Sequence, residues 1–109
     1  MAAAGATGDP FEALGDPIRR EIVRMLSAGG KPVHELAAAL PVSRPAVSRH
    51  LRLLKEAGLV GEHPVGTRRF YHLQDEGVQA IQAYLEGVWG EAAARFRLTA
   101  ENTTPGERP

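Results

Sequence analysis

The sequence predicts a mainly α-helical protein with one small β-hairpin, and three observations support this prediction. Apolar residues recur at helical spacing in several segments, two of which begin with an Asp-Pro pair. Residues 59–73 instead contain two strand-like runs joined by Pro and Gly. The chain has 109 residues, of which 43% are hydrophobic, and this suits one domain with one core. We therefore expect a single domain over residues 9–98.

The composition excludes several classes of protein. The chain contains no cysteine, so disulfides, thiol catalysis and thiolate metal sites are excluded. The first residues lack a basic region followed by a long apolar run, and no run of 18 apolar residues occurs in the chain. These features predict a soluble cytoplasmic protein that does not enter a membrane. The polar, Gly- and Pro-containing ends, residues 1–8 and 99–109, are expected to be disordered.

The first two predicted helices begin at proline. Asp9-Pro10 and Asp16-Pro17 each place a capping carboxylate before a proline, which suits the first turn of a helix. The second helix carries apolar residues at i, i+4, i+7 and i+8 spacing, and Gly29-Gly30 ends it. A short helix is then expected over residues 34–40, closed by a proline.

The next predicted helix has one apolar and one basic face. Ser43 is a suitable N-cap, Pro45 lies in the first turn, and Gly58 ends the helix. The apolar face consists of Val47, Leu51 and Leu54. The opposite face consists of Arg44, Ser48, Arg49, Arg52 and Lys55. A tight Leu-Pro-Val-Ser connection joins this helix to the preceding one, a pattern typical of a helix-turn-helix whose second helix enters the major groove of DNA. An ordinary solvated charged face is the alternative.

A basic hairpin is expected directly after this helix. Residues 59–63 and 69–73 are strand-like, and the turn between them carries Thr67 and Arg68 near its tip. Such a hairpin is a wing, from which Arg68 would reach the minor groove or a phosphate and Arg69 a phosphate. Residues 41–72 contain six basic and two acidic side chains, a local charge of +4, whereas the whole chain has a net charge of zero. A basic patch on an otherwise acidic body favours binding of a polyanion.

The predicted last helix, over residues 75–98, indicates a homodimer. Its apolar residues follow a near-heptad spacing, widened by Tyr84 and Trp89. At 1.5 Å per residue this helix would be about 35 Å long, more than so small a domain covers by itself. We expect this helix and the first one to pack against their symmetry mates, although the alternative is that one turn packs and the remainder frays. The predicted interface residues are Phe11, Leu14, Val78, Ile81, Leu85, Val88, Trp89, Ala92 and Phe96.

Three segments carry a resemblance to a known family. They are FEALGDPIRREIVRMLSAGG, ELAAALPVSRPAVSRHLRLLKEAGLV and VGTRRFYHL. From about residue 11 to residue 98 the chain resembles the ArsR/SmtB-type winged-helix transcriptional repressors of bacteria. The resemblance implies a twofold dimer that binds an inverted-repeat operator, with half-sites about one helical turn apart. The DNA-binding residues indicated by the basic face and by the resemblance are Ser43, Arg44, Pro45, Ser48, Arg49, His50, Arg52, Arg68 and Arg69.

Within this set the roles differ. Arg44 and Arg49 are the expected guanine contacts, because a guanidinium pairs with the O6 and N7 acceptors of guanine. The resemblance implies that Pro45 and Ser48 also lie in the groove, and that Ser43 and His50 lie near phosphates. Other basic side chains would supply affinity that depends on salt and not on sequence.

The chain departs from the family pattern where metal sensors hold their metal. The segment PVHELAAAL has no thiol where thiolate sensors carry Cys-x-Cys, and the last helix contains no histidine. His63 and His72 would lie across from one another if the hairpin loop is long, but two histidines make an incomplete zinc site. We predict no metal and no cofactor, and a small-molecule effector stays open.

Other functions fit the sequence less well. An enzyme would need a nucleophile and a base held together, whereas Ser48 and His50 lie on an exposed helix with no third residue to orient them, so no catalytic residue is predicted. A winged helix that docks on another protein has little reason to gather arginines on one face. A metal-responsive repressor would need an atypical site. The sequence thus predicts a regulator, and more specifically a repressor, whose partner is double-stranded DNA.

Overall fold

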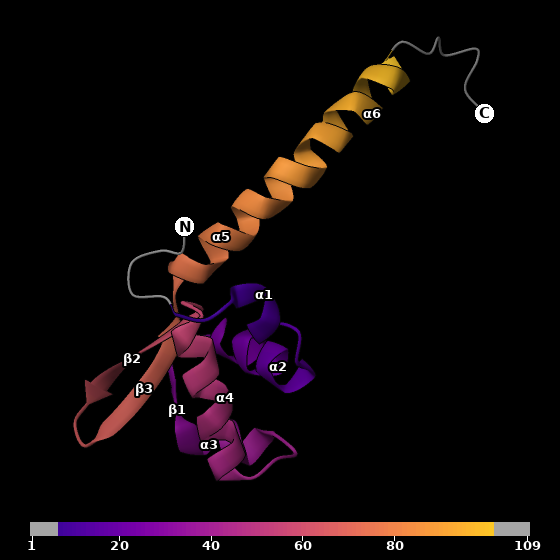
Figure 1. The fold of residues 1–109 in the computed structure, drawn as a ribbon. Helices are drawn as coiled ribbons and strands as arrows, with labels where there is room; N and C mark the ends of the chain where they lie inside the picture. The colour runs from indigo at the N-terminus through magenta and orange to yellow at the C-terminus, as the bar shows by residue number, and fades with distance from the viewer. Residues whose placement is uncertain (1–6, 102–109) are drawn as a thin grey trace.

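The computed structural model describes residues 7–101, with side chains described as far as residue 97. Its elements are α1 (Pro10–Ala13), α2 (Pro17–Leu26), β1 (Lys31–Pro32), α3 (Val33–Ala39), α4 (Arg44–Glu56), β2 (Val60–Val65), β3 (Arg68–Leu73), α5 (Asp75–Leu85), a π-helical turn (Glu86–Gly90) and α6 (Glu91–Glu101). Figure 1 shows α1 to α4 gathered beside a small sheet, from which α5 and α6 project as one long helix. The prediction of a mainly helical fold with a small antiparallel sheet is confirmed.

The predicted helix starts are confirmed at the level of single hydrogen bonds. The Asp9 side chain accepts a hydrogen bond from the Phe11 amide at 2.9 Å, and that of Asp16 accepts one from the Arg19 amide at 3.0 Å. Ser43 Oγ accepts a hydrogen bond from the Ala46 amide at 3.3 Å. Each of these three helices has a proline in its first turn, where no backbone N–H is needed.

The sheet has one strand more than the sequence predicts. Its order is β1-β3-β2, with both pairs antiparallel. Val65 lies opposite Arg68, so the turn consists of two residues only, and Gly66 there adopts a left-handed φ of 64°. The wing strands therefore extend nearer to the turn than predicted, and Arg68 belongs to β3. Pro64 is tolerated because β2 is an edge strand.

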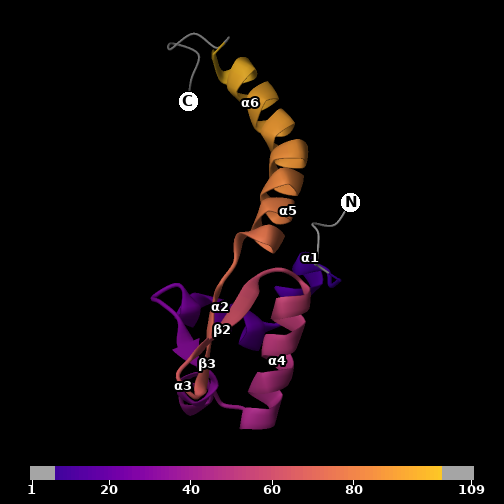
Figure 2. The same ribbon diagram turned by 90° about the vertical axis from the view of Figure 1, so that its left-hand side faces the viewer.

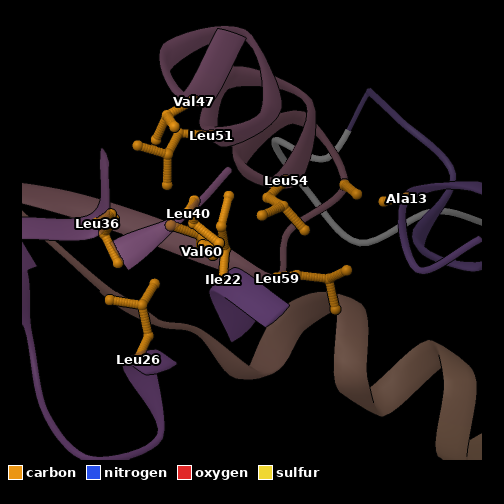
Figure 3. Packing of buried hydrophobic residues seen from close by; sticks show 11 residues of the cluster. Ala13, Ile22, Leu26, Leu36, Leu40, Val47, Leu51, Leu54, Leu59 and Val60 are labelled. Carbon is orange, nitrogen blue, oxygen red and sulfur yellow. The ribbon is translucent and has the colours of Figure 1, made fainter. Parts of the chain in front are cut away.

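The core lies between α2, α3, α4 and the first residue of β2. Ile22, Leu36, Leu51 and Leu54 are almost completely buried and point toward one another in Figure 3. Burial of each such side chain stabilises the fold by about 1.5–3 kcal/mol. Because the apolar face of α4 is held in this core, its polar face must point to solvent.

The long C-terminal helix is mostly uncovered. Figures 1 and 2 show it leaving the body of the domain, and the structure measures 65 × 32 × 22 Å with a radius of gyration of 19.0 Å. A compact domain of about 100 residues would have a radius of gyration of about 13 Å. The Gly77 amide donates a hydrogen bond to the Gly58 carbonyl at 2.7 Å, and this contact joins the start of α5 to the end of α4.

The described part of the chain extends beyond the predicted bounds of the domain at both ends. Residues 1–6 and 102–109, on which most of the predicted disorder falls, lie outside the described residues. The amides of Thr7 and Gly8 both donate hydrogen bonds to the Glu56 carbonyl, at 2.9 and 2.6 Å. The last helix continues to Glu101, three residues beyond its predicted end. Within residues 7–101, no helix combines the length and the apolar character that crossing a membrane requires.

Candidate nucleic-acid interface

Most of the polar face of α4 is exposed. Seven of the predicted DNA-binding residues lie on or just before this helix, and six of them are exposed. The exposed residues are Ser43, Arg44, Pro45, Ser48, Arg49 and Arg52. Because α4 has 13 residues, this face extends for about 20 Å. A helix with its side chains is about 10–12 Å across, which fits a major groove of DNA about 12 Å wide.

The wing adds two exposed arginines next to this face. Arg68 and Arg69 are the first two residues of β3 and are both exposed. Arg69 Nη1 donates to Glu62 Oε1 at 2.6 Å, and Lys55 Nζ donates to Glu62 Oε2, also at 2.6 Å. Glu62 thus bridges the last turn of α4 and the wing. The sequence pattern does not predict this bridge, although Glu62 is the only carboxylate between residues 59 and 73.

The bridge lowers the pKa of Glu62. The main cause is the hydrogen bond from Lys55; the charges of Lys55 and Arg69 lower the pKa further, and partial burial opposes them. A carboxyl group whose pKa is lower in the folded protein contributes stability above its ordinary pKa of 4.5, and this contribution is lost as the pH falls through the folded-state value. The bridge therefore holds the wing at neutral pH.

Glu62→Gln is expected to lower the free energy of unfolding by about 1 kcal/mol at pH 7, because two partly exposed ion pairs are lost. The difference from wild type should shrink as the pH falls below 4.5. Binding to random DNA should become tighter, since Lys55 and Arg69 are released. Denaturant unfolding at pH 7 and pH 3 measures the first effect, and Glu12→Gln, which removes an exposed carboxylate from α1, is the control. Equal destabilisation at both pH values would contradict an ionic role for Glu62.

His50 is placed differently from the other predicted DNA-binding residues. Its side chain is only 13% exposed and faces α2. Arg19 Nη1 donates to His50 Nδ1 at 3.2 Å, and Asp16 Oδ2 lies 3.9 Å from the same nitrogen. The imidazole is thus held against α2, and the expectation that His50 lies near phosphates stays a prediction. Its position three residues after Val47 and four before Leu54 places it beside the buried stripe of α4.

Arg19 extends this contact to α1. Its Nε donates to the Ala13 carbonyl at 2.7 Å, and its Nη2 donates to the Glu12 carbonyl at 3.4 Å. The Asp16 carboxyl has a pKa below its ordinary value, mainly because the Arg19 amide donates a hydrogen bond to it. One guanidinium thus connects the end of α1, the start of α2 and the middle of α4.

The two wing histidines are neighbours despite the short turn. His63 lies opposite Phe70 and His72 lies opposite Gly61, so the two are diagonal partners, and their Nδ1 atoms are 3.1 Å apart. A long hairpin loop is therefore not required for the two histidines to meet, because diagonal side chains on adjacent strands can contact each other. Residues 7–101 contain no group of three or more His, Cys, Asp or Glu side chains arranged to hold a metal.

The predicted dimer residues divide into two groups. Leu14 and Ile81 are half-buried and pack against the core of their own chain. The others are exposed, and Trp89 and Phe96 are 57% and 75% exposed. The rings of Phe11 and Tyr84 are 5.2 Å apart at 74°, so α1 and α5 form one continuous apolar surface. The exposed members are Phe11, Val78, Leu85, Val88, Trp89, Ala92 and Phe96.

Sequence comparisons relate the chain to bacterial regulators. The family model described as "Bacterial regulatory protein, arsR family" matches residues 16–62. The HTH-type transcriptional regulator Rv2034 of Mycobacterium tuberculosis is 50% identical over 86 residues, which are 79% of this chain and 80% of that protein. The HTH-type transcriptional repressor SmtB of the same species is 43% identical over 76 residues, which are 70% of this chain and 56% of that protein.

Solved structures share the fold over most of the chain. A protein described as a possible transcriptional regulator for arsenical resistance has a TM-score of 0.68 and 38% identity, over 88% of this chain and 98% of that one. The homodimeric winged helix-turn-helix DNA-binding domain of Mb0332 from Mycobacterium bovis has a TM-score of 0.60 and 29% identity, over 79% of this chain and 80% of that one.

Proposed function

The chain belongs to the ArsR family of winged helix-turn-helix transcriptional regulators and is not an enzyme, and from this premise we propose that it represses transcription as a homodimer on an inverted-repeat operator. The observation that carries the proposal is the orientation of α4. Its apolar face is locked in the core, while its exposed face presents three arginines beside a basic wing. Occupation of promoter DNA by such a protein blocks transcription, and the relative SmtB is named a repressor.

The dimeric part of the proposal rests on the uncovered helix. A continuous apolar surface along α5 and α6 is unusual for a monomer, and a second copy would cover it. The relative Mb0332 is described as homodimeric. A twofold dimer places two copies of α4 in successive major grooves, about 34–36 Å apart, and the operator must then be an inverted repeat.

Arg49 is the residue we assign to base recognition. It lies in the middle of the exposed face of α4, and its side chain makes no hydrogen bond or ion pair to another described residue. A guanidinium that is free in the absence of DNA can bind the O6 and N7 atoms of one guanine bidentately. Arg52 lies one turn further along and is assigned to the phosphates.

Nuclease footprinting tests this function. The probe is a genomic fragment that the purified protein retains at physiological salt, and the expected result is two protected half-sites, related by twofold symmetry and centred about one helical turn apart. Protection of a single asymmetric site would contradict a dimer of this geometry.

His50 is assigned to the positioning of α4. His50→Ala is expected to weaken operator binding severalfold, because α4 loses its link to α2, while the slope of binding against salt stays that of the wild type. His50→Asn should restore much of the affinity, since an amide oxygen can accept the hydrogen bond from Arg19. Fluorescence anisotropy at several salt concentrations measures both quantities. A reduced salt slope in His50→Ala would instead identify His50 as a phosphate contact.

A further inference from the structure

A hollow of about 290 Å³ lies between the wing, the start of α3 and the start of α4. The residues with polar side chains that line it are His34, Arg44, Thr67, Arg68, Arg69 and Tyr71. Pockets that take drug-sized ligands usually measure about 300–1,000 Å³, so this hollow suits a small group. Its location connects the two parts of the proposed DNA-binding face, because Arg44 begins α4, the proposed recognition helix, while Thr67 lies in the turn of the wing and Arg68 begins β3.

The charge of the lining favours an anion. Three arginines line the hollow, and of these only Arg69 has a carboxylate partner, Glu62. Within the described part of the chain, Arg44 and Arg68 have neither an ion pair nor a side-chain hydrogen bond. Like charges repel when they gather in one place, and an anion between them removes this repulsion. Arginine side chains and a threonine hydroxyl are donors suited to the oxygens of a phosphate.

The side chains of Arg44 and Arg49 point in different directions around the axis of α4. Residues five positions apart on an α-helix point about 140° away from each other around its axis, so these two arginines face different directions. Residues eleven positions apart, such as Arg44 and Lys55, lie on nearly the same side. Lys55 faces the wing, since it donates to Glu62 of β2 at 2.6 Å. Arg44 therefore faces the wing as well, and its place in the lining of the hollow agrees with this.

We propose that this hollow holds one backbone phosphate of the operator in each half-site, between Arg44 on α4 and Thr67 and Arg68 on the wing. Arg44 is then a phosphate contact, in place of the guanine contact expected from the sequence, and base recognition by arginine falls to Arg49. This inference rests on the proposed function. It adds a role to the wing, because a phosphate held from both sides fixes the wing and the recognition helix on the same DNA strand.

The first arm of the test compares Arg44 with Arg49 on operator and random DNA. Arg44→Ala should weaken binding about 10-fold on both, and should lower the slope of log affinity against log salt by about 1 per protomer, with base preference unchanged. Arg44→Lys should keep the slope, since lysine also binds a phosphate, whereas Arg49→Lys should lose base preference. Relaxed preference at one base position in Arg44→Ala, with the salt slope unchanged, would overturn the assignment.

The second arm neutralises single phosphates of the operator with methylphosphonate groups. Neutralisation of one particular phosphate per half-site should weaken wild-type binding about as much as Arg44→Ala does. The same neutralisation should have little further effect on the Arg44→Ala protein, because that contact is already lost. Additive losses at every position would overturn the proposal. Failure of the proposed function can be distinguished from failure of the phosphate assignment, since in the first case the wild-type protein would retain no specific fragment at all.

The third arm separates DNA from a soluble phosphate as the ligand. Inorganic phosphate is titrated into the free protein at constant ionic strength while the amide resonances of Thr67 and Arg68 are followed. Weak binding, with half-saturation above about 1 mM, is the expected result, because a single phosphate lacks the remaining DNA contacts. Half-saturation far below that concentration would identify a soluble phosphate as the ligand and overturn the assignment to the operator.

Discussion

Arg49→Ala weakens binding to the operator by about 1–3 kcal/mol per half-site and relaxes base preference at one position of each half-site. The reason is that a bidentate pair between a guanidinium and guanine is lost. Binding to random DNA should change little, because the main contact of Arg49 is to a guanine, and a random site has guanine at that position only by chance. Affinities measured on the operator, on operators with single base changes and on random DNA give all three quantities.

Arg24→Ala is the matched control for this substitution. Arg24 is exposed on α2 and pairs with Glu21, so it belongs neither to α4 nor to the wing. The Arg24→Ala substitution should leave the affinity for the operator unchanged. If Arg49→Ala instead lowers affinity equally on operator and random DNA, Arg49 is a phosphate contact and the base-recognition part of the account is wrong.

Leu85→Glu is expected to separate the dimer into folded monomers. Leu85 is 45% exposed in the single chain, so the substitution costs the monomer little, whereas in a dimer it would bury a carboxylate without a partner. The cost of several kcal/mol corresponds to a loss of about 100-fold or more in dimer affinity. Operator binding should fall in parallel, because one protomer contacts a single half-site. Analytical ultracentrifugation and circular dichroism measure assembly and folding.

Gln79→Glu carries the same new charge on a different side of α5 and is the control. Gln79 is exposed and lies about 120° around the helix from Leu85. This variant should remain dimeric. A Leu85→Glu protein that stays dimeric and keeps operator affinity would show that the dimer forms through a different surface.

Local chemistry made much of the fold predictable. The starts of α1, α2 and α4 follow from Asp9, Asp16 and Ser43, each of which caps its helix as expected. Gly58, with a φ of 74°, ends α4 where a left-handed residue is needed. These features involve residues close together in the chain, so single-sequence patterns are sufficient to find them.

Features that depend on residues far apart in the chain cannot be predicted from local sequence patterns. The strand β1 is two residues long and exists only because Lys31 pairs with Tyr71, forty residues later. The Glu62 bridge depends on the pairing of β2 with β3 and on the place of the wing beside α4. Local sequence patterns predict neither of these pairings.

Helical position alone does not decide which surface covers a residue at the edge of an apolar face. His50 is adjacent to the buried stripe of α4, and a helical projection alone would have placed it beside Leu54 and not on the basic face. Leu14 and Ile81 fit the pattern of the dimer surface, yet they pack on the core of their own chain. Periodicity identifies an apolar face but does not say which neighbour covers it.

Selection of genomic fragments by the purified protein tests the central claim most directly, when it is repeated at low and at physiological salt. The account predicts that a few fragments sharing an inverted repeat are retained at the higher salt, because base contacts supply affinity that salt does not remove. Uniform retention at low salt that disappears at physiological salt would contradict a sequence-specific repressor.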